Sequence, residues 1–241
     1  MDEPRESLSL PDAEAGRDTL SPSFEKQTVD EPVFTAVLGD VLEALERDDL
    51  PFLVIGGVAS SVWGRPRWTQ DIDIMVRPVD ARHALDALER SGFATEETFG
   101  HWLYKGVKDD VIVDVLFQSS GGIYLDEEML ERRVLREFGG LKLPLAAPED
   151  LIVMKAVAHE EETPRYWHDA LSIIARAELD WDYLLKRARI RARRILALLV
   201  YAQSNDLVVP DGVVKALFEM VFDESEHRPG EEGRGGAGTP T

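Results

Sequence analysis

The middle of the chain alternates between apolar runs of strand length and segments with helical periodicity. Short apolar runs predict buried or half-buried strands at 52–55, 71–76, 101–105, 111–117 and 141–145. Helices are predicted at 34–48, 58–64 and 81–91, where apolar residues recur at the spacing of one helix face. From Pro148 onward the pattern is helical throughout, with Pro148 and Pro164 at two helix starts and further helices at 180–203 and 211–222. The pattern therefore predicts an α/β part followed by an all-helical part.

The two ends of the chain differ from the middle. Residues 1–31 are rich in Asp, Glu, Ser and Pro, and residues 223–241 end in GEEGRGGAGTPT. Such segments cannot bury enough apolar surface to become ordered. We therefore expect a disordered acidic tail at 1–31, a folded domain at 32–147, a helical part at 148–222 and a disordered tail at 223–241.

Composition narrows the class of protein. With 241 residues, 44% of them hydrophobic, the chain can bury a core. Cysteine is absent, which excludes disulfides and thiolate metal sites. No secretory or membrane-spanning apolar segment is present, so we expect a cytoplasmic protein without a membrane partner. The net charge is −19, of which the tails carry −6 and −3, so the central part is acidic at −10.

The first chemical signal is a pair of acidic residues in an apolar strand. Side chains two apart on a strand share a face, so Asp71 and Asp73 project together while Ile72 and Ile74 enter the core. Two adjacent carboxylates repel, and unless one is protonated the pair needs a cation. Oxygen ligands of this kind suit Mg²⁺.

A third carboxylate lies in a later strand. Asp114 interrupts the run VIVDVLF at 111–117, where an unpaired buried charge would cost several kcal/mol. If this strand lies beside the strand of Asp71 and Asp73, three carboxylates converge and can hold one or two divalent ions, either Mg²⁺ or Mn²⁺. Structural carboxylates on half-exposed strands are the alternative.

These residues carry a resemblance to a known family. A Gly-Gly pair, thirteen residues, Asp-x-Asp and a later strand Asp resemble the signature of the DNA-polymerase-β-like nucleotidyltransferase superfamily. The segments Gly56-Gly57-x-Ala59 and Arg67-x-Thr69-x-Asp71-Ile72-Asp73-Ile74 are similar to its small prokaryotic branch, which includes the AbiEii-type abortive-infection, type IV toxin nucleotidyltransferases. The match covers roughly residues 33–175.

The resemblance implies a fold and a reaction. The fold is an α/β (α+β) nucleotidyltransferase fold, in which helices flank a small mixed sheet and a helical C-terminal part completes the active site. The reaction transfers a nucleoside monophosphate from a nucleoside triphosphate (NTP) to an acceptor hydroxyl, with Asp71, Asp73 and Asp114 holding two Mg²⁺ ions and Asp114 as the candidate base.

Nucleotide contacts are expected at the glycine-rich turn. Gly56 and Gly57 precede a helix, so backbone N–H groups at its N-terminus can reach a triphosphate. Ser60 adds a hydroxyl donor, and Thr69 stands where the family often has Ser or Thr. An ordinary strand-to-helix turn, with Thr69 as a turn cap, is the alternative.

Two arginines and the later helices supply further candidates. Arg65 and Arg67 are either phosphate or acceptor contacts or solvated loop charges. By resemblance, Lys155 contacts the nucleotide phosphate, with a surface lysine as the alternative, and Arg165 and Asp169 match a binding motif. The chain departs from that motif by having His at 168 and Ser at 172.

Basic residues concentrate in one predicted helix. Its apolar stripe comprises Leu184, Leu185, Ala188, Ala192, Ile195 and Leu199. Its cations are Lys186, Arg187, Arg189, Arg191, Arg193 and Arg194, three of which (187, 191 and 194) are predicted to share one side. They form either a solvated face or a surface for RNA or another anionic partner.

Three functions remain open from the sequence. The nearest resemblance implies a toxin that modifies RNA, such as the acceptor end of tRNA, with a cognate antitoxin as partner. A small cationic acceptor such as an aminoglycoside is the rival, because an acidic protein attracts cations. A non-catalytic nucleotide-binding or antitoxin module is the third, against which the three aspartates argue.

Overall fold

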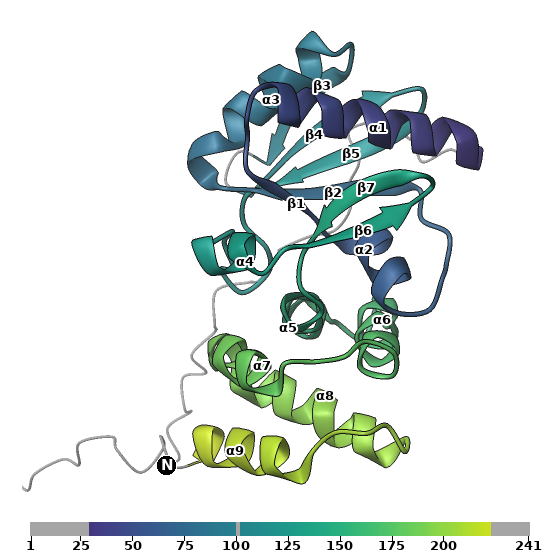
Figure 1. Ribbon diagram of the computed structural model, residues 1–241. Helices are drawn as coiled ribbons and strands as arrows, with labels where there is room; N and C mark the ends of the chain where they lie inside the picture. The colour runs from purple at the N-terminus through teal and green to yellow at the C-terminus, as the bar shows by residue number, and fades with distance from the viewer. Residues whose placement is uncertain (1–28, 100–101, 223–241) are drawn as a thin grey trace, which may run out of the picture.

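The computed structural model describes residues 29–99 and 102–222 (Figure 1). The predicted tails at 1–31 and 223–241 fall outside these residues except for the stretch 29–31, in which Val29 is buried and Glu31 begins the first helix. The first residue of the strand predicted at 101–105 is also outside them.

A seven-stranded mixed sheet forms the upper half of the molecule in Figure 1. Its strand order is β3-β4-β5-β2-β1-β7-β6, with parallel pairing at β2–β5 and β1–β7 and antiparallel pairing elsewhere. The strands are β1 (Phe52–Val54), β2 (Asp71–Val76), β3 (Ala94–Phe99), β4 (Leu103–Lys108), β5 (Val111–Leu116), β6 (Val134–Phe138) and β7 (Leu141–Leu145). The α/β fold class predicted from the sequence is confirmed.

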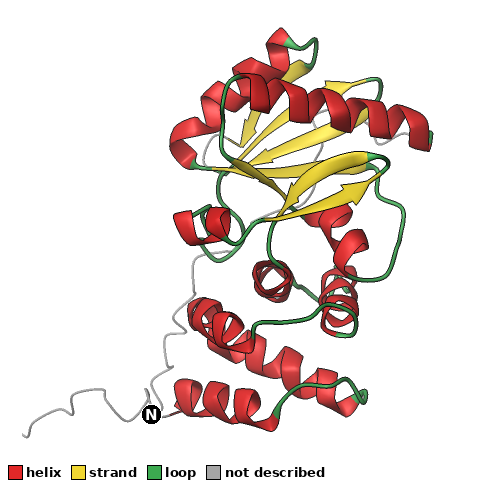
Figure 2. Cartoon of the chain, in the orientation of Figure 1, coloured by secondary structure: helices red, strands yellow, loops and turns green. Residues whose placement is uncertain are grey.

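Helices cover both faces of the sheet (Figure 2). On one face lie α1 (Glu31–Arg47) and α3 (Ala81–Arg90), which follows the 3₁₀ turn η1 (Pro78–Asp80). On the other lie α2 (Gly56–Trp63), α5 (Pro148–Ala158) and α6 (Arg165–Ile174), with the short α4 (Glu127–Glu131) beside the sheet. Below them stack α7 (Trp181–Ala188), the 3₁₀ turn η2 (Arg189–Arg191), α8 (Ala192–Ser204) and α9 (Asp211–Phe222).

Helix α5 lies at the centre of the helical half. It is buried along residues 148–157 and contacts α2, α6, α7 and α8. A helix enclosed on every side needs no polar face, so its few charged side chains require partners inside the protein. Those partners define much of the site described below.

Most predicted elements are confirmed, but three were missed. Strand β3 reads ATEETF and β6 reads VLREF, so neither shows clear alternation of apolar and polar residues. Both are edge strands of the sheet, where few side chains need to be apolar. Helix α4 has only five residues, too few to display a period.

The single helix predicted at 180–203 is wrong. The chain forms α7, the 3₁₀ turn η2 and then α8, and Arg191 leaves helical geometry at φ −152° and ψ 54°. The break lets α7 and α8 both pack against α5. None of the helices in the part of the chain that the structure describes is long and apolar enough to cross a membrane.

Candidate active site

Three aspartates lie on two adjacent strands. Asp73 on β2 is the direct register partner of Asp114 on β5, and Asp71 lies two residues earlier on β2. Ile72 and Ile74 between and beyond them are fully buried. The expected pairing of these two strands is confirmed, and it places Asp71 and Asp73 on one face with Asp114 beside them.

The pKa of Asp73 is strongly raised. Withdrawal from solvent raises its pKa first, the negative charges of Asp71 and Asp114 raise it further, and together they bring it to about 7. The charge of Lys155 and a hydrogen bond from the Gly57 N–H act in the opposite direction. The cluster therefore carries more negative charge than its neighbours neutralise.

Each carboxylate is also held by a neighbouring group. The backbone N–H of Gly57 donates to Oδ2 of Asp73 at 3.2 Å. The Thr69 hydroxyl donates to Oδ1 of Asp71 at 2.8 Å. Nζ of Lys105 lies 2.7 Å from Oδ1 of Asp114. Thr69, a predicted nucleotide contact, thus supports the first aspartate.

The carboxylate oxygens of the three aspartates suit a hard divalent cation, although the three side chains do not converge on one point. Within residues 29–99 and 102–222, no three Asp, Glu, His or Cys side chains are arranged so that together they could hold one ion. Asp71 and Asp73 nevertheless offer carboxylate oxygens from one face of β2, the ligands that Mg²⁺ and Mn²⁺ prefer. The raised pKa of Asp73 is the mark of a site where added positive charge is favourable.

The glycine pair allows α2 to begin against these carboxylates. Gly56 has φ +61°, and a Cβ there would lie 1.8 Å from Oδ2 of Asp73. A Cβ on Gly57 would lie 2.3 Å from Oγ1 of Thr69. Ser60 is buried, and its hydroxyl donates to the carbonyl of Gly56 at 2.6 Å. The helix N-terminus and the aspartates therefore share one small volume.

A group of basic side chains acts electrostatically on Asp73. Nε and Nη2 of Arg67 donate to the two carboxylate oxygens of Asp169 at 2.9 and 2.8 Å, and Nζ of Lys155 is 3.2 Å from Oδ2 of Asp169. The Lys155 side chain is only 8% exposed, so the alternative of a surface lysine is wrong. Because burial disfavours its charged form, the pKa of Lys155 is lowered.

Asp169 holds this basic group together. Burial alone would raise its pKa, but the hydrogen bond from Arg67 and the positive charge of Lys155 outweigh burial and hold the pKa below its usual range. The alternative of a solvated loop charge is therefore wrong for Arg67. Asp169, predicted as a nucleotide contact, has both carboxylate oxygens engaged by cations of the protein.

Two other predicted contacts lie at the periphery. The Arg65 side chain is exposed, and its backbone N–H donates to the Ser172 hydroxyl at 3.1 Å. Arg165 is exposed, with its guanidinium 5.9 Å from the centre of the Tyr166 ring. The structure brings neither arginine into the group around Asp73, unlike Arg67.

Lys105 was missed by sequence reasoning. It is 4% exposed, and its register partner across β4–β5 is Asp114. A signal was available in the Asp109-Asp110 pair between the two strand-like runs, which in the structure forms a two-residue turn with positive φ at both positions and fixes the hairpin register. Counting back from that turn pairs residue 105 with residue 114.

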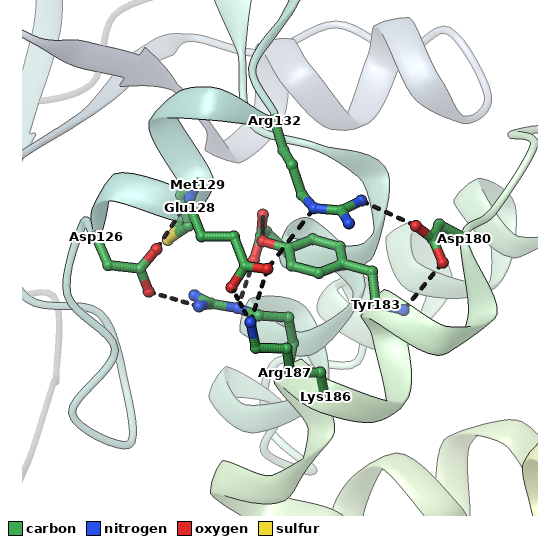
Figure 3. A network of polar contacts seen from close by, with 9 residues as sticks. Asp126, Glu128, Met129, Arg132, Asp180, Tyr183, Lys186 and Arg187 are labelled. Carbon is green, nitrogen blue, oxygen red and sulfur yellow. Dashed lines mark hydrogen bonds and ion pairs between the residues drawn. The ribbon is translucent and has the colours of Figure 1, made fainter.

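The basic run of the C-terminal part is divided by the structure (Figure 3). Nε of Arg187 lies 2.8 Å from Oδ1 of the buried Asp150, and Nη1 lies 2.5 Å from Oδ2 of Asp126. Lys186 pairs with Glu128 at 2.7 Å. Arg187 therefore does not share an exposed side with residues 191 and 194, because it is a partner of a buried carboxylate.

The remaining cations of the run stay exposed. They are Arg189, Arg191, Arg193 and Arg194, and none forms an ion pair with a carboxylate of the described residues. Arg194 donates to the backbone carbonyl of His159, just beyond α5. The exposed basic cluster, as we call these four arginines, thus lies at the junction of η2 and α8 near the end of α5.

A mixed sheet flanked by helices, with paired strand aspartates beside a glycine-initiated helix, is consistent with a nucleotidyltransferase fold. The chain belongs to the family described as "uncharacterised nucleotidyltransferase", whose model matches residues 7–204. It is therefore a nucleotidyltransferase, a class of enzyme that generally uses divalent metal ions. A search of curated proteins found no match.

Several solved structures are similar in fold. The antibiotic-resistance enzyme ANT(2″)-Ia in complex with adenylyl-2″-tobramycin is 17% identical, with a TM-score of 0.46, covering 66% of this chain and 97% of its own. The lincosamide antibiotic adenylyltransferase LnuA, bound to lincomycin, is 15% identical, with a TM-score of 0.44 and coverages of 61% and 99%. A tRNA nucleotidyltransferase complexed with a primer tRNA and an ATP analogue is 13% identical, with a TM-score of 0.31 and coverages of 78% and 71%.

Proposed function

We propose that the protein transfers a nucleoside monophosphate from an NTP to an acceptor hydroxyl, with Asp71, Asp73 and Asp114 at the reaction centre. One observation carries this proposal. Asp73 lies in register with Asp114 and against the N-terminus of α2, while the positive charges of Lys155 and Arg67 act on it. Carboxylates for metal and cations for phosphate are the two requirements of this transfer.

The proposed cofactor is Mg²⁺, with two ions per site and Mn²⁺ as a substitute. Asp71 and Asp73 would hold both ions, and Asp114 would contribute to one of them. Bound there, the ions would neutralise the carboxylates, stabilise the charge of the triphosphate and activate the acceptor hydroxyl.

The remaining roles belong to the chain itself. The N-terminus of α2, at Gly56 and Gly57, orients the triphosphate through its partial positive charge, while the Gly57 N–H holds Asp73. Lys155 and Arg67 stabilise negative charge on the phosphates. The acceptor oxygen bonds to the α-phosphorus as the bond to pyrophosphate breaks, and the hydroxyl proton passes to Asp114. Ser60 and Thr69 support this frame, and Arg65 and Arg165 are peripheral candidates for acceptor contacts.

In this proposal, the site is built from two parts of the chain. Residues 32–147 contribute the sheet and its aspartates, and residues 148–222 contribute Lys155 and Asp169. The helical part therefore completes the active site. The ion pair of Arg67 with Asp169 is one of the links between the two parts.

The proposed acceptor is RNA, in the role of an AbiEii-type toxin that modifies tRNA and is restrained by an antitoxin. The exposed basic cluster supports this choice, because clustered cations gain affinity for a phosphate backbone by releasing counterions. It lies beyond the end of α5, the helix that carries Lys155. A bound strand would therefore be near the site.

A small cationic acceptor is the second candidate. The net charge of −19 favours it, because an acidic protein attracts cations and repels nucleic acid at long range. An aminoglycoside is an example of such an acceptor.

The test combines a substrate panel with one substitution. Purified protein is incubated with each labelled NTP and Mg²⁺, together with total RNA or a panel of aminoglycosides. Label on RNA supports the first acceptor and label on an aminoglycoside the second. We expect Asp73→Ala to lower transfer by at least about 100-fold, because a ligand of the ions that stabilise the transition-state charge is lost. The matched control is Glu89→Ala, on the exposed face of α3.

The same variant separates function from stability. Removing one carboxylate from a repelling cluster should leave the thermal midpoint of metal-free protein unchanged or higher. A large drop in that midpoint, or transfer activity equal to wild type, would contradict the assignment of Asp73 to the reaction centre.

A further inference from the structure

Asp73, Asp114 and Lys105 form one row across three adjacent strands. Asp73 is in register with Asp114 on the neighbouring strand, and Asp114 is in register with Lys105 on the next. Nζ of Lys105 lies 2.7 Å from Oδ1 of Asp114, and the two side chains are 5% and 19% exposed. The last carboxylate of the row therefore has a cation of the protein in contact with one of its two oxygens.

We propose that Lys105 is a positioning residue that withholds Asp114 from metal coordination, so that the second divalent ion binds only by displacing the lysine ammonium. The proposal rests on the function proposed above. In it, Asp71 and Asp73 take the first ion unaided, and occupation of the Asp114 side depends on Lys105 moving away.

The pairing is built into the fold. A lysine with so little exposure is rare without a partner, because its charge must be neutralised inside the protein. The hairpin turn at Asp109 and Asp110 fixes the register of β4 and β5, so Lys105 cannot pair with another residue of β5 without disturbing the ladder. Lys108 on the same strand lies instead 2.7 Å from Asp40, on α1.

The ammonium of Lys105 and a divalent ion compete for Asp114 because both are positively charged. Lys155 acts electrostatically on Asp73, and Lys105 pairs directly with Asp114, so ammonium groups act on two of the three carboxylates. A divalent ion placed on Asp114 would face the ammonium of Lys105 at close range, and like charges repel.

The experiment counts bound Mn²⁺ on the full chain in the presence of a non-hydrolysable NTP, by calorimetry and by electron paramagnetic resonance. The wild type should bind one ion tightly and a second ion at least about tenfold more weakly. Lys105→Met should bind the second ion at least about tenfold more tightly, and Lys105→Arg should behave as wild type. Lys108→Met, from the same strand, is the matched control and should leave both affinities unchanged.

Thermal unfolding gives a second readout that does not depend on activity. Lys105→Met leaves Asp114 without its cation, so the metal-free variant should melt at a lower temperature and Mn²⁺ should raise its midpoint more than that of the wild type. If Lys105→Met unfolds during preparation without metal, it is prepared in Mn²⁺, and Lys105→Gln is measured alongside.

The outcomes distinguish the two proposals. Normal binding of the first ion, with an unchanged second affinity and thermal shift in Lys105→Met, would overturn the role of Lys105 alone. Absence of Mn²⁺ binding by the wild type, or first-ion binding by Asp73→Asn equal to wild type, would overturn the proposed function and with it the role of Lys105.

Discussion

Arg67 and Asp169 form a bidentate ion pair in the candidate site, with Nε and Nη2 of the arginine 2.9 and 2.8 Å from the two carboxylate oxygens. Lys155 shares one of those oxygens at 3.2 Å. The residues of the pair are 102 positions apart, on the connection that leads into β2 and on α6. Asp169 therefore aligns two cations that we assign to the nucleotide phosphates.

The first prediction concerns this alignment. Asp169→Asn should lower the free energy of unfolding by about 1–3 kcal/mol, because two partly buried cations lose a charged acceptor. It should also raise KM for the NTP, since both cations are then free to turn away. Urea unfolding and NTP titration measure the two effects. Arg67→Lys, which keeps the charge but loses the fork, should show a smaller change of the same sign.

The second prediction concerns the start of α2. Gly56→Ala should lower both the free energy of unfolding and the transfer rate, because its Cβ would collide with the Asp73 carboxylate and its φ is +61°. Gly140→Ala is the control, since Gly140 has φ +81° with no atom within 4 Å of the added Cβ. The control measures the cost of placing Ala at a positive φ without a collision, about 1 kcal/mol. Equal destabilisation of the two variants would show that Asp73 does not closely abut α2.

The third prediction concerns the division of the basic run. Arg187→Gln should lower the free energy of unfolding by about 3–5 kcal/mol, because it leaves the 1%-exposed Asp150 without its cation. Arg189→Gln should change it by less than about 0.5 kcal/mol, as expected for an exposed position. Chemical denaturation of both variants checks this. Similar stability of the two variants would indicate instead that Arg187 and Arg189 are both solvated.

The fourth prediction is a pH dependence. Burial raises the pKa of Asp150 to about 6 despite the opposing charge of Arg187. The folded protein therefore binds a proton between about pH 4 and 6 that the unfolded chain does not, so this group adds stability as the pH falls through 6 and loses it as the pH rises. The free energy of unfolding of the wild type, relative to Asp150→Asn, should increase by about 1 kcal/mol from pH 7 to pH 5, because the pH then lies one unit below the raised pKa. If the free energy of unfolding depends on pH in the same way in the wild type and in Asp150→Asn, the raised pKa of Asp150 is contradicted.

Local features of the chain were enough to predict much of the sheet and of the candidate site. Residues two apart on a strand share a face, so the common direction of Asp71 and Asp73 follows from strand geometry alone. The pairing of Lys105 with Asp114 was not predicted, although it is also set locally by the two-residue turn that joins their strands. The glycine pair at the start of α2 could be predicted from the sequence because a turn with positive φ favours glycine over other residues.

Tertiary structure alone decided what surrounds those residues. The parallel pairing of β2 with β5 joins strands separated by α3, β3 and β4, so the register of Asp73 with Asp114 is not set by any local turn. Arg67, Lys155 and Asp169 meet because α5 and α6 fold back against the connection between α2 and β2. The basic run divides for the same reason: whether an arginine is solvated or paired depends on where distant carboxylates such as Asp150 come to lie, and charge pairing across such distances leaves no period in the sequence.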